Sequence, residues 1–474
     1  NAWRDFDQGG VLRAFLLGIS MNEEYRQFID GKHYKAVAAG FPHQCAHEWL
    51  FDYQRSCVEW ACQRGKAALF LDTGLGKTNC ELAWAQAVES HAKGPVIILA
   101  PLCVSKQIQQ EAERFGFSVV GVREDSEIGE RGIYVTNYEN LHNIECSRFV
   151  GVVLDESSIL KGLEGRLRRR ITEAFSRTPY RLSASATPAP NDYMELGTQA
   201  EFLGLMTSTE MLATFFIHDG GDTTKWRLKG HGQKKFFEWL ASWAVVMRDP
   251  SVFGFDKKPE LPPLNVQKVT IESGKTDGLL PALAQSLSER LAARRDTVDA
   301  RCMAAAELAN SIDGPVLVWC ARNDEGDLLE SLIPDSVQIA GSDKPQDKES
   351  RMMGFIDGSH RVLVSKVRIA GFGMNFQHCA NMIFVGMNDS WEQYYQAVRR
   401  CWRFGQTKPV NVWIITADIE GMVIENIGRK DEQAETMMVE MEKIAGACLK
   451  DFSAAQKNML AYRPQKSAPL PKFI

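Results

Sequence analysis

Short apolar runs that end in polar or turn residues recur along the chain. Most of their residues are Val, Ile, Leu and Phe, as strands buried on both faces of a sheet require. Stretches with helical periodicity separate the runs, as at residues 79–90 and 392–402. This alternation predicts parallel sheets built from βαβ units. The runs are Ala67–Asp72, Val96–Pro101, Gly151–Glu156, Val316–Cys320, Arg361–Ser365, Met382–Gly386 and Val410–Ile415.

The runs fall into two groups, one before about residue 190 and one after about residue 315. A chain of 474 residues suffices for two domains of typical size plus further elements. We therefore expect an α/β fold with two parallel-sheet domains. The expected division is an N-terminal extension (1–40), a first domain (41–203), a helical insertion (204–262), a linker strand and helix (263–314), a second domain (315–430) and a C-terminal helix and tail (431–474).

The expected insertion differs in character from the rest of the chain. It carries three Trp residues among Lys and Arg, and Pro residues punctuate its end. Trp239 and Trp243 are four residues apart and would share the buried face of a helix, which favours a self-packing helical lobe. Aromatic side chains among positive charges could instead stack on nucleic-acid bases.

The overall charge disfavours a protein that is basic throughout. The formal net charge is −5, so any contact with nucleic-acid phosphates must come from local clusters of Lys and Arg. Residues 161–181 form such a cluster, with seven Lys or Arg against two Glu. This cluster is either a solvated helix or a surface that faces phosphates.

Cysteine usage and hydropathy indicate a cytoplasmic protein. The eleven Cys lack paired spacing and no secretory segment is visible, so reduced thiols are the simplest interpretation. No apolar run reaches the length of roughly 18 residues that a membrane span needs. The cluster His43-x-Cys45-x-His47 lacks a second ligand pair, which disfavours a metal site. Met21 begins a plausible reading frame of its own, so residues 1–20 could be an upstream extension.

A candidate phosphate-binding loop follows the first apolar run. The chain reads Asp-Thr-Gly-Leu-Gly-Lys-Thr at residues 72–78, and a helical pattern starts at once. Gly74 and Gly76 allow a tight bend that points backbone N–H groups at phosphate oxygens, beside the positive end of the helix. Lys77 would reach the β- and γ-phosphates, and the Thr78 hydroxyl would hold Mg²⁺.

A pair of carboxylates ends another buried run. Asp155 and Glu156 follow Val152-Val-Leu154, and the carboxyl end of a parallel strand is where ligands of α/β sheets bind. Asp155 can orient Mg²⁺ through water. Glu156 is then placed to polarise the attacking water as a general base.

Five segments occur in an order that resembles superfamily 2 helicases and, within them, the Swi/Snf-type DNA-dependent ATPases. The resemblance covers about residues 48–430 and is greatest to the small helicase-like proteins of phages and prophages. It implies two tandem RecA-like domains that bind ATP and Mg²⁺ between them and move along double-stranded DNA, in the bacterial host cytoplasm if the protein is phage-encoded. The segments are Phe51–Gln54, the phosphate loop, Asp155–Ser158, Ser185–Asn191 and Gln396–Gln406.

The resemblance assigns further roles around the nucleotide. Gln54 matches the adenine-reading glutamine, whose amide offers a donor and an acceptor. Ser185 and Thr187 match the segment that couples hydrolysis to domain movement, and their hydroxyls could bond to the Asp155-Glu156 strand. Thr73, with the loop residues, and Gly373, within Ile369–Asn375, are expected to approach the nucleotide.

The second domain supplies the segment that identifies a motor. Gln396, Arg400, Arg403 and the following Gly-Gln match Gln-x-x-x-Arg-x-x-Arg-x-Gly-Gln of the family. Spacings of four and three would place the three side chains on one helix face. Gln396 is expected to couple the domains, and the two arginines to neutralise charge on the γ-phosphate. Arg399 falls on another face and is expected to be solvated.

Nucleic-acid contacts are also implied by the resemblance, at Ser105, Thr136 and Asn137, since hydroxyls and amides bind phosphates without reading bases. Double-stranded DNA is the expected partner, and a nuclease or other DNA-processing protein is a further one. Three alternatives remain: an RNA helicase, the motor subunit of a restriction or defence complex, and a scaffold that binds nucleotide without hydrolysing it.

Overall fold

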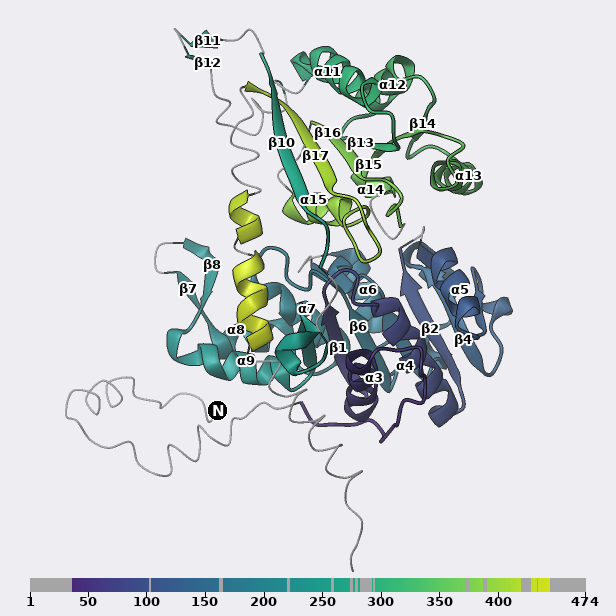
Figure 1. The fold of residues 1–474 in the computed structure, drawn as a ribbon. Coiled ribbons are helices and arrows are strands. Elements are labelled where there is room, and N and C mark those ends of the chain that lie inside the picture. The colour runs from purple at the N-terminus through teal and green to yellow at the C-terminus, as the bar shows by residue number, and fades with distance from the viewer. Residues whose placement is uncertain are drawn as a thin grey trace, which may run out of the picture.

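The computed structural model places two α/β domains one above the other (Figure 1). It describes residues 36–443 except for 102–103, 162–164, 220–221, 257–259, 273–275, 278–279, 282–291, 293–294, 371–374, 387–389, 419–427 and 433. The expected N-terminal extension and C-terminal tail lie largely outside the described residues.

The first domain contains a seven-stranded sheet in the order β3-β4-β2-β5-β6-β1-β9, and every neighbouring pair is parallel. Because β6 lies between β5 and β1, the segments that follow these three strands meet at one edge of the sheet. The strands are β1 (Lys66–Leu71), β2 (Pro95–Ala100), β3 (Val119–Gly121), β4 (Gly132–Asn137), β5 (Gly151–Leu154), β6 (Tyr180–Ala184) and β9 (Ala244–Met247).

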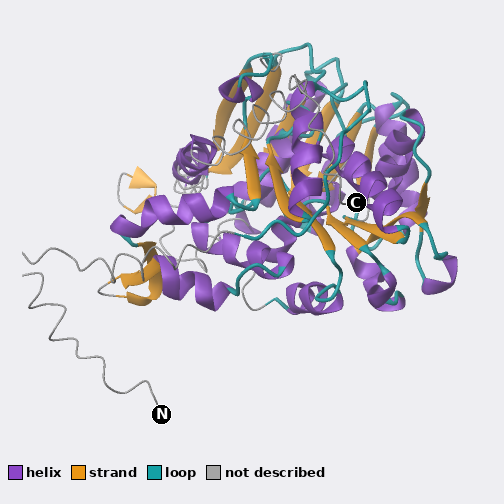
Figure 2. Ribbon diagram, turned by 90° about the horizontal axis from the view of Figure 1, so that it is seen from below, coloured by secondary structure: helices purple, strands orange, loops and turns teal. Residues whose placement is uncertain are grey.

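Helices cover both faces of this sheet (Figure 2). Successive strand residues point to opposite faces, so Leu69 packs with α3, α4 and α5 while Phe70 packs with α6 to α9. Burial on both faces explains why these strands are almost entirely apolar. The helices are α3 (Asp52–Arg64), α4 (Lys77–Ala92), α5 (Val104–Arg114), α6 (Arg166–Ala174), α7 (Leu196–Leu203), α8 (Ser208–Phe215) and α9 (Gln233–Ala241).

The second domain contains a six-stranded parallel sheet in the order β10-β17-β16-β13-β15-β14. Its two faces are again covered by helices, which bury Trp319 on one side and Val318 on the other. The strands are β10 (Leu264–Ile271), β13 (Val316–Cys320), β14 (Ser336–Ile339), β15 (Val362–Lys366), β16 (Asn381–Val385) and β17 (Val410–Ala417). The helices are α11 (Val298–Asn310), α12 (Asn323–Leu332), α13 (Pro345–Ile356), α14 (Val367–Ala370) and α15 (Trp391–Val398).

The fold class expected from the sequence is confirmed: two tandem parallel-sheet α/β domains of RecA-like type. Each of the seven apolar runs forms a strand. The segment 204–262 contains helices α8 and α9, but also the antiparallel hairpin β7 (Phe216–Asp219) and β8 (Asp222–Leu228), and β9, which pairs with β1. Trp239 and Trp243 are both buried, with their ring centroids 5.2 Å apart, but they do not share a helix face, because α9 ends at Ala241 and Trp243 lies in the turn that follows.

The chain passes between the domains twice. The first passage leads from β9 to β10, and the second follows β17 and ends in the helical residues 434–443 (the C-terminal segment), drawn in yellow in Figure 1. The C-terminal segment packs on the first domain, where Glu442 accepts hydrogen bonds from the N–H groups of Arg248 (2.6 Å) and Asp249 (3.0 Å). Both passages line one cavity of about 310 Å³, through Arg248 and Leu264 from the first and Asp431 and Glu435 from the second.

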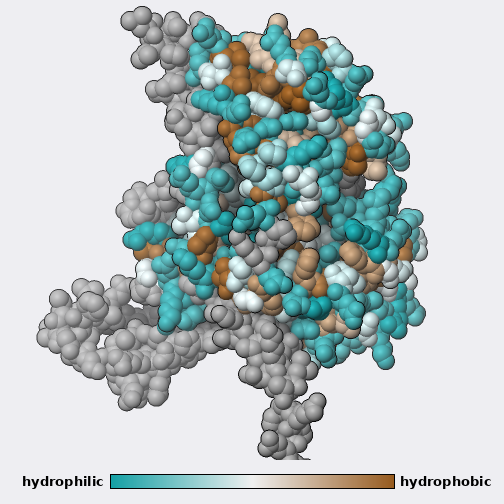
Figure 3. All heavy atoms as spheres, viewed as in Figure 1, coloured by the Kyte–Doolittle hydropathy of each residue, from teal (hydrophilic) through white to brown (hydrophobic). Residues whose placement is uncertain are grey.

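The face in Figure 3 is largely hydrophilic, with apolar side chains gathered near the top of the upper domain. Within the described part of the chain, no helix combines the length and apolar character needed to cross a membrane.

Candidate nucleotide site and adjoining groove

The loop between β1 and α4 has the backbone geometry of a phosphate site. Gly74 and Gly76 adopt φ angles of 86° and 72°, in the left-handed region that favours glycine. No side chain caps the start of α4, so its first N–H groups and the helix dipole are directed at the loop. The Lys77 ammonium donates to the Leu71 carbonyl at 3.1 Å and lies folded over the loop.

Asp155 and Glu156 end β5 beside this loop. Burial, followed by the charge of Glu156, raises the pKa of Asp155 to about 7. Glu156 has a φ of 53°, which is uncommon for a residue with a side chain. Such conformations concentrate at functional sites, where the surrounding structure holds them in place. The backbone therefore directs the Glu156 carboxylate to a fixed position in the cleft.

Sequence reasoning missed a third carboxyl group, Glu81 on α4. Its side chain is buried, and burial together with the charge of Asp155 raises its pKa well above the ordinary value. Burial away from water disfavours the charged form of a carboxyl group, and a neighbouring negative charge disfavours it further. The only sequence signal is an acidic residue within an otherwise apolar stretch of the helix.

The segment after β6 lies between the phosphate loop and the Asp155-Glu156 turn, but its hydroxyls bond differently from the expectation. Ser185 is fully buried and its Oγ accepts a hydrogen bond from the N–H of Thr187 at 3.1 Å, within the same turn. The Thr187 Oγ1 atom is buried without a hydrogen-bond partner among the described residues. The expected bond to the Asp155-Glu156 strand is therefore not formed, because the turn satisfies Ser185 locally.

The arginine segment of the second domain is not one continuous helix. Helix α15 ends at Val398, and residues 399–405 form turns. Gln396, Arg400 and Arg403 therefore do not share a helix face, contrary to the spacing argument. All three nevertheless line the same cleft, together with Gly405, which has a φ of 92°.

Arg400 reaches across the cleft, with its Nη2 atom 4.0 Å from Glu156 Oε1. Arg403 is half-buried, and burial lowers the pKa of its guanidinium. Its Nε atom and the Oε1 atom of Gln396 are buried without a hydrogen-bond partner in the described chain. Buried polar groups normally have partners, so these atoms are the ones that a ligand in the cleft could satisfy.

Arg399 is not solvated, which corrects the expectation for this residue. Its side chain lies over the rings of Tyr395 and Trp402, at 5.1 and 4.6 Å from the ring centroids. Its Nη2 atom is 3.5 Å from Asp72 Oδ2 at the entrance to the phosphate loop. Because α15 ends before residue 399, the helical wheel that turned Arg399 outward does not apply.

A polar cavity of about 370 Å³ lies between the domains and collects most of the expected nucleotide residues. Gln54 is one of them, although its amide is engaged: Nε2 donates to the Leu75 carbonyl at 2.9 Å, and Oε1 accepts from the Phe51 N–H at 3.0 Å. Ser185 does not line the cavity, and Gly373 lies outside the described residues. The lining includes Gln54, Thr73, Gly74, Gly76, Lys77, Thr78, Asp155, Glu156, Thr187, Gln396, Arg400 and Arg403.

These residues fit an Mg²⁺-bound nucleoside triphosphate. The uncapped start of α4 and Lys77 suit phosphate oxygens, and a hydroxyl with a single carboxylate suits Mg²⁺, which keeps most of its waters. Thr78 and Asp155 supply that pair at the same cavity. The unpartnered atoms of Thr187, Gln396 and Arg403 face the same space.

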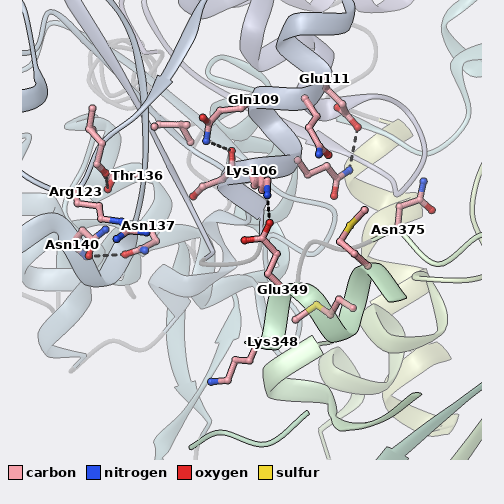
Figure 4. A pocket seen from close by; sticks show the side chains of 18 of the residues that line it. Lys106, Gln109, Glu111, Arg123, Thr136, Asn137, Asn140, Lys348, Glu349 and Asn375 are labelled. Atoms are coloured by element: carbon pink, nitrogen blue, oxygen red, sulfur yellow. Dashed lines mark hydrogen bonds and ion pairs between the residues drawn. The ribbon is translucent and has the colours of Figure 1, made fainter. Parts of the chain in front are cut away.

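A larger groove of about 780 Å³ adjoins the nucleotide cavity and runs between α5 of the first domain and α13 of the second (Figure 4). Ser105, Thr136 and Asn137 line it, as expected. The Thr136 hydroxyl donates to the Val122 carbonyl at 2.6 Å, and Asn137 accepts from the Asn140 N–H at 2.8 Å. The Ser105 hydroxyl has no hydrogen-bond partner among the described residues.

The remaining sequence clusters have mainly structural roles. In the basic stretch, Lys161 pairs with Glu392 of the second domain, Arg168 with Glu201, and Arg181 donates to the Phe202 carbonyl. Arg166, Arg169, Arg170 and Arg177 are exposed. Within the described residues, no group of three or more His, Cys, Asp or Glu side chains could hold a metal ion.

Comparisons with known proteins show similarity to helicases and ATPases. Residues 300–405, which include Gln396, Arg400 and Arg403, match a family model described as the helicase conserved C-terminal domain. The chain is 23% identical over 434 residues to the chromodomain-helicase-DNA-binding protein 1-like of Danio rerio, covering 77% of this chain and 41% of that protein. It thus spans less than half the length of this curated relative.

The chain is also similar to a solved structure described as the Sulfolobus solfataricus SWI2/SNF2 ATPase core in complex with dsDNA. The TM-score is 0.40 and the sequence identity is 16%, and the match covers 91% of this chain and 100% of that chain. The helicase C-terminal match and the chromodomain-helicase relative support the class suggested by the motifs, a superfamily 2 helicase of the Swi/Snf type.

Proposed function

We propose that this protein is an ATP-dependent DNA translocase that hydrolyses ATP in the cavity between its two sheets. The observation that carries the proposal is the approach of Arg400 to Glu156 at 4.0 Å across that cavity. A phosphate loop alone would suit many nucleotide-binding proteins. Arginines from a second RecA-like domain make hydrolysis depend on how the two domains are placed relative to each other.

The residues of the first domain would bind the phosphates and activate water. Lys77 leaves the Leu71 carbonyl and pairs with the β- and γ-phosphates, beside the N–H groups at the start of α4. Glu156 accepts a proton from the water that attacks the γ-phosphorus. Mg²⁺, held by Thr78 and Asp155, would supply charge neutralisation at the phosphate oxygens.

The residues of the second domain would stabilise the transition state. Arg400 and Arg403 donate to the oxygens on which negative charge accumulates, a contribution on the order of 10³–10⁵ in related phosphoryl transfer. Gln396, in the same cavity, would report the state of the nucleotide to α15. Closure with ATP and opening after hydrolysis then move the two domains along a strand in alternation.

Double-stranded DNA is the proposed track. The groove beside the cavity carries Lys106, Arg114, Arg123 and Lys348 together with hydroxyls and amides, which suit the phosphate backbone. Groove and cavity share lining residues, including Gln107 and Arg114. The relative from Danio rerio is named as a DNA-binding helicase.

The test is phosphate release from ATP with no nucleic acid, with duplex DNA and with RNA. Stimulation by duplex DNA is expected. Absence of stimulation by DNA would refute translocation on it, and stimulation by RNA alone would favour an RNA helicase. Displacement of a triplex strand without separation of duplex strands would identify a translocase that does not unwind.

A further inference from the structure

The entrance of the phosphate loop is in direct contact with the second domain. The Tyr395 hydroxyl donates to Asp72 Oδ1 at 2.6 Å, and Arg399 Nη2 lies 3.5 Å from Asp72 Oδ2. Burial raises the pKa of Tyr395, so the phenol keeps its proton and acts as a donor. Both oxygens of one carboxylate in the first domain thus meet side chains of the second.

Asp72 in turn holds the phosphate loop. Its Oδ1 atom also accepts a hydrogen bond from the Thr73 N–H at 2.7 Å, and its own N–H donates to the Met247 carbonyl at 2.9 Å. The carboxylate of Asp72 therefore holds the Thr73 N–H at the start of the loop, while the backbone N–H of Asp72 ties the same residue to β9. Any movement of Tyr395 or Arg399 is transmitted to the residue that begins the phosphate site.

The same contact fixes the arginine segment. Arg399 directly precedes Arg400, and its N–H donates to the Tyr395 carbonyl at 3.0 Å. The Arg399 guanidinium lies over the rings of Tyr395 and Trp402. The Arg399 side chain is 13% exposed, and the Asp72 side chain is 11% exposed. A charge-assisted contact with so little solvent access is stronger than a surface ion pair, so it can set the position of a turn that no helix stabilises.

We propose that Asp72, Tyr395 and Arg399 form a positioning contact that aligns Arg400 and Arg403 with the phosphate loop. The inference rests on the proposed ATPase function and assigns Arg399 to it as a positioning residue. Nucleotide binding depends mainly on Lys77 and the start of α4 in the first domain, whereas transition-state stabilisation depends on the alignment across the cleft. Loss of the contact should therefore lower kcat and leave the KM for ATP nearly unchanged.

The variants Arg399→Gln and Asp72→Asn test this in steady-state ATP turnover. A small misalignment of catalytic groups can lower rates by about a hundredfold, so we expect kcat to fall by about ten- to a hundredfold with KM changed by less than about threefold. Arg399→Lys, which keeps the charge, should recover part of kcat. The double variant should be no slower than the slower single variant, because both remove one contact.

The matched control is Arg148→Gln. Arg148 forms an Arg–Asp pair with Asp125 at 2.9 Å within the first domain, and its loss should leave kcat unchanged. Wild-type kcat in Arg399→Gln, or multiplicative losses in the double variant, would overturn the inference.

Hydrogen exchange provides a readout that does not depend on turnover. Arg399→Gln should speed amide exchange both in residues 72–78 and in residues 395–403, while Arg148→Gln should affect neither. If the wild-type protein lacks ATPase activity but these segments respond together, the contact stands and the proposed function fails. If the wild-type protein hydrolyses ATP and neither segment responds, the inference fails alone.

Discussion

Arg400 Nη2 and Glu156 Oε1 lie 4.0 Å apart although they belong to different parallel-sheet domains. This approach makes the interdomain cavity a composite site, in which neither domain holds all of the proposed catalytic groups. Four predictions follow from the geometry around it.

Arg403→Ala should lower kcat for ATP hydrolysis by on the order of 10³, because the guanidinium would no longer neutralise charge on the γ-phosphate. Binding of a fluorescent ATP analogue should change little, since Lys77 and the start of α4 remain. The two measurements are turnover and equilibrium binding. Arg322→Ala is the control, because Arg322 pairs with Asp324 on the surface of the same domain. Normal turnover in Arg403→Ala would remove this residue from the catalytic set.

Lys77→Ala should abolish nucleotide binding and turnover together, which distinguishes it from Arg403→Ala. The fold should survive, because the hydrogen bond of the Lys77 ammonium goes to a single backbone carbonyl, that of Leu71 next to the loop. Circular dichroism checks the fold, and binding of the fluorescent analogue checks the site. Lys408→Ala, an exposed position of the second domain, should behave as wild type. Retained affinity in Lys77→Ala would contradict the assignment of the phosphate loop.

The sequence predicts both sheets because strands buried on both faces have an unmistakable apolar pattern. It fails where a strand is short or half exposed, as in β3 and β14, or where a strand adjoins a helix, as in β9 after α9. The sequence predicts candidate site residues where the chemistry is local, as at Lys77 and Glu156, and both of these line the interdomain cavity. The contact of Arg399 with Asp72 is not predictable from the sequence, because the two residues are far apart along the chain. In addition, the residue spacing at 396–403 is compatible with a helix, although residues 399–405 form turns.

The stability of the Mg²⁺-free and nucleotide-free protein should depend on pH through Asp155. Its pKa is about 7 in the folded state against an ordinary value of 3.8, so between these values the folded protein binds the extra proton. The free energy of unfolding contributed by this group is therefore greatest at low pH and is lost as pH rises towards 7. Relative to Asp155→Asn, the wild-type protein should lose about 1.4 kcal/mol per pH unit between pH 5 and 7, and nothing further above about pH 8.

Urea unfolding of both proteins at pH 5, 6, 7 and 8 provides the comparison, since titrating groups distant from Asp155 cancel in the difference, whereas Glu81, whose pKa depends on the charge of Asp155, titrates together with it. Parallel curves for the two proteins across this range would contradict the raised pKa.

Glu349→Gln should strengthen binding to duplex DNA. The Glu349 carboxylate pairs with Lys106 across the groove (Figure 4), and both side chains are substantially exposed, at 45% and 63%. Removing the carboxylate frees the ammonium for a phosphate and lowers the negative charge of the groove. Because exposed pairs are weak, we expect a gain of about two- to tenfold at low salt.

Fluorescence anisotropy with labelled duplex DNA over a salt series measures this effect. Glu113→Gln is the control, because Glu113 is an exposed residue of α5 outside the groove. The gain should shrink as salt rises, since phosphate contacts are screened. An equal gain in Glu113→Gln would mean that net charge, and not the pair with Lys106, controls affinity.

The two chain passages between the domains lie together, at the cavity lined by Arg248, Leu264, Asp431 and Glu435. The nucleotide cavity comes next, sharing Tyr395 and Arg399 with it, and the groove of Lys106 and Glu349 lies beyond. The two chain passages are thus at one end of this row, the nucleotide cavity is in the middle, and the groove is at the other end. Under the proposed function, a rotation of the domains about the two passages would displace the walls of the groove more than those of the nucleotide cavity, because the groove lies farther from the passages.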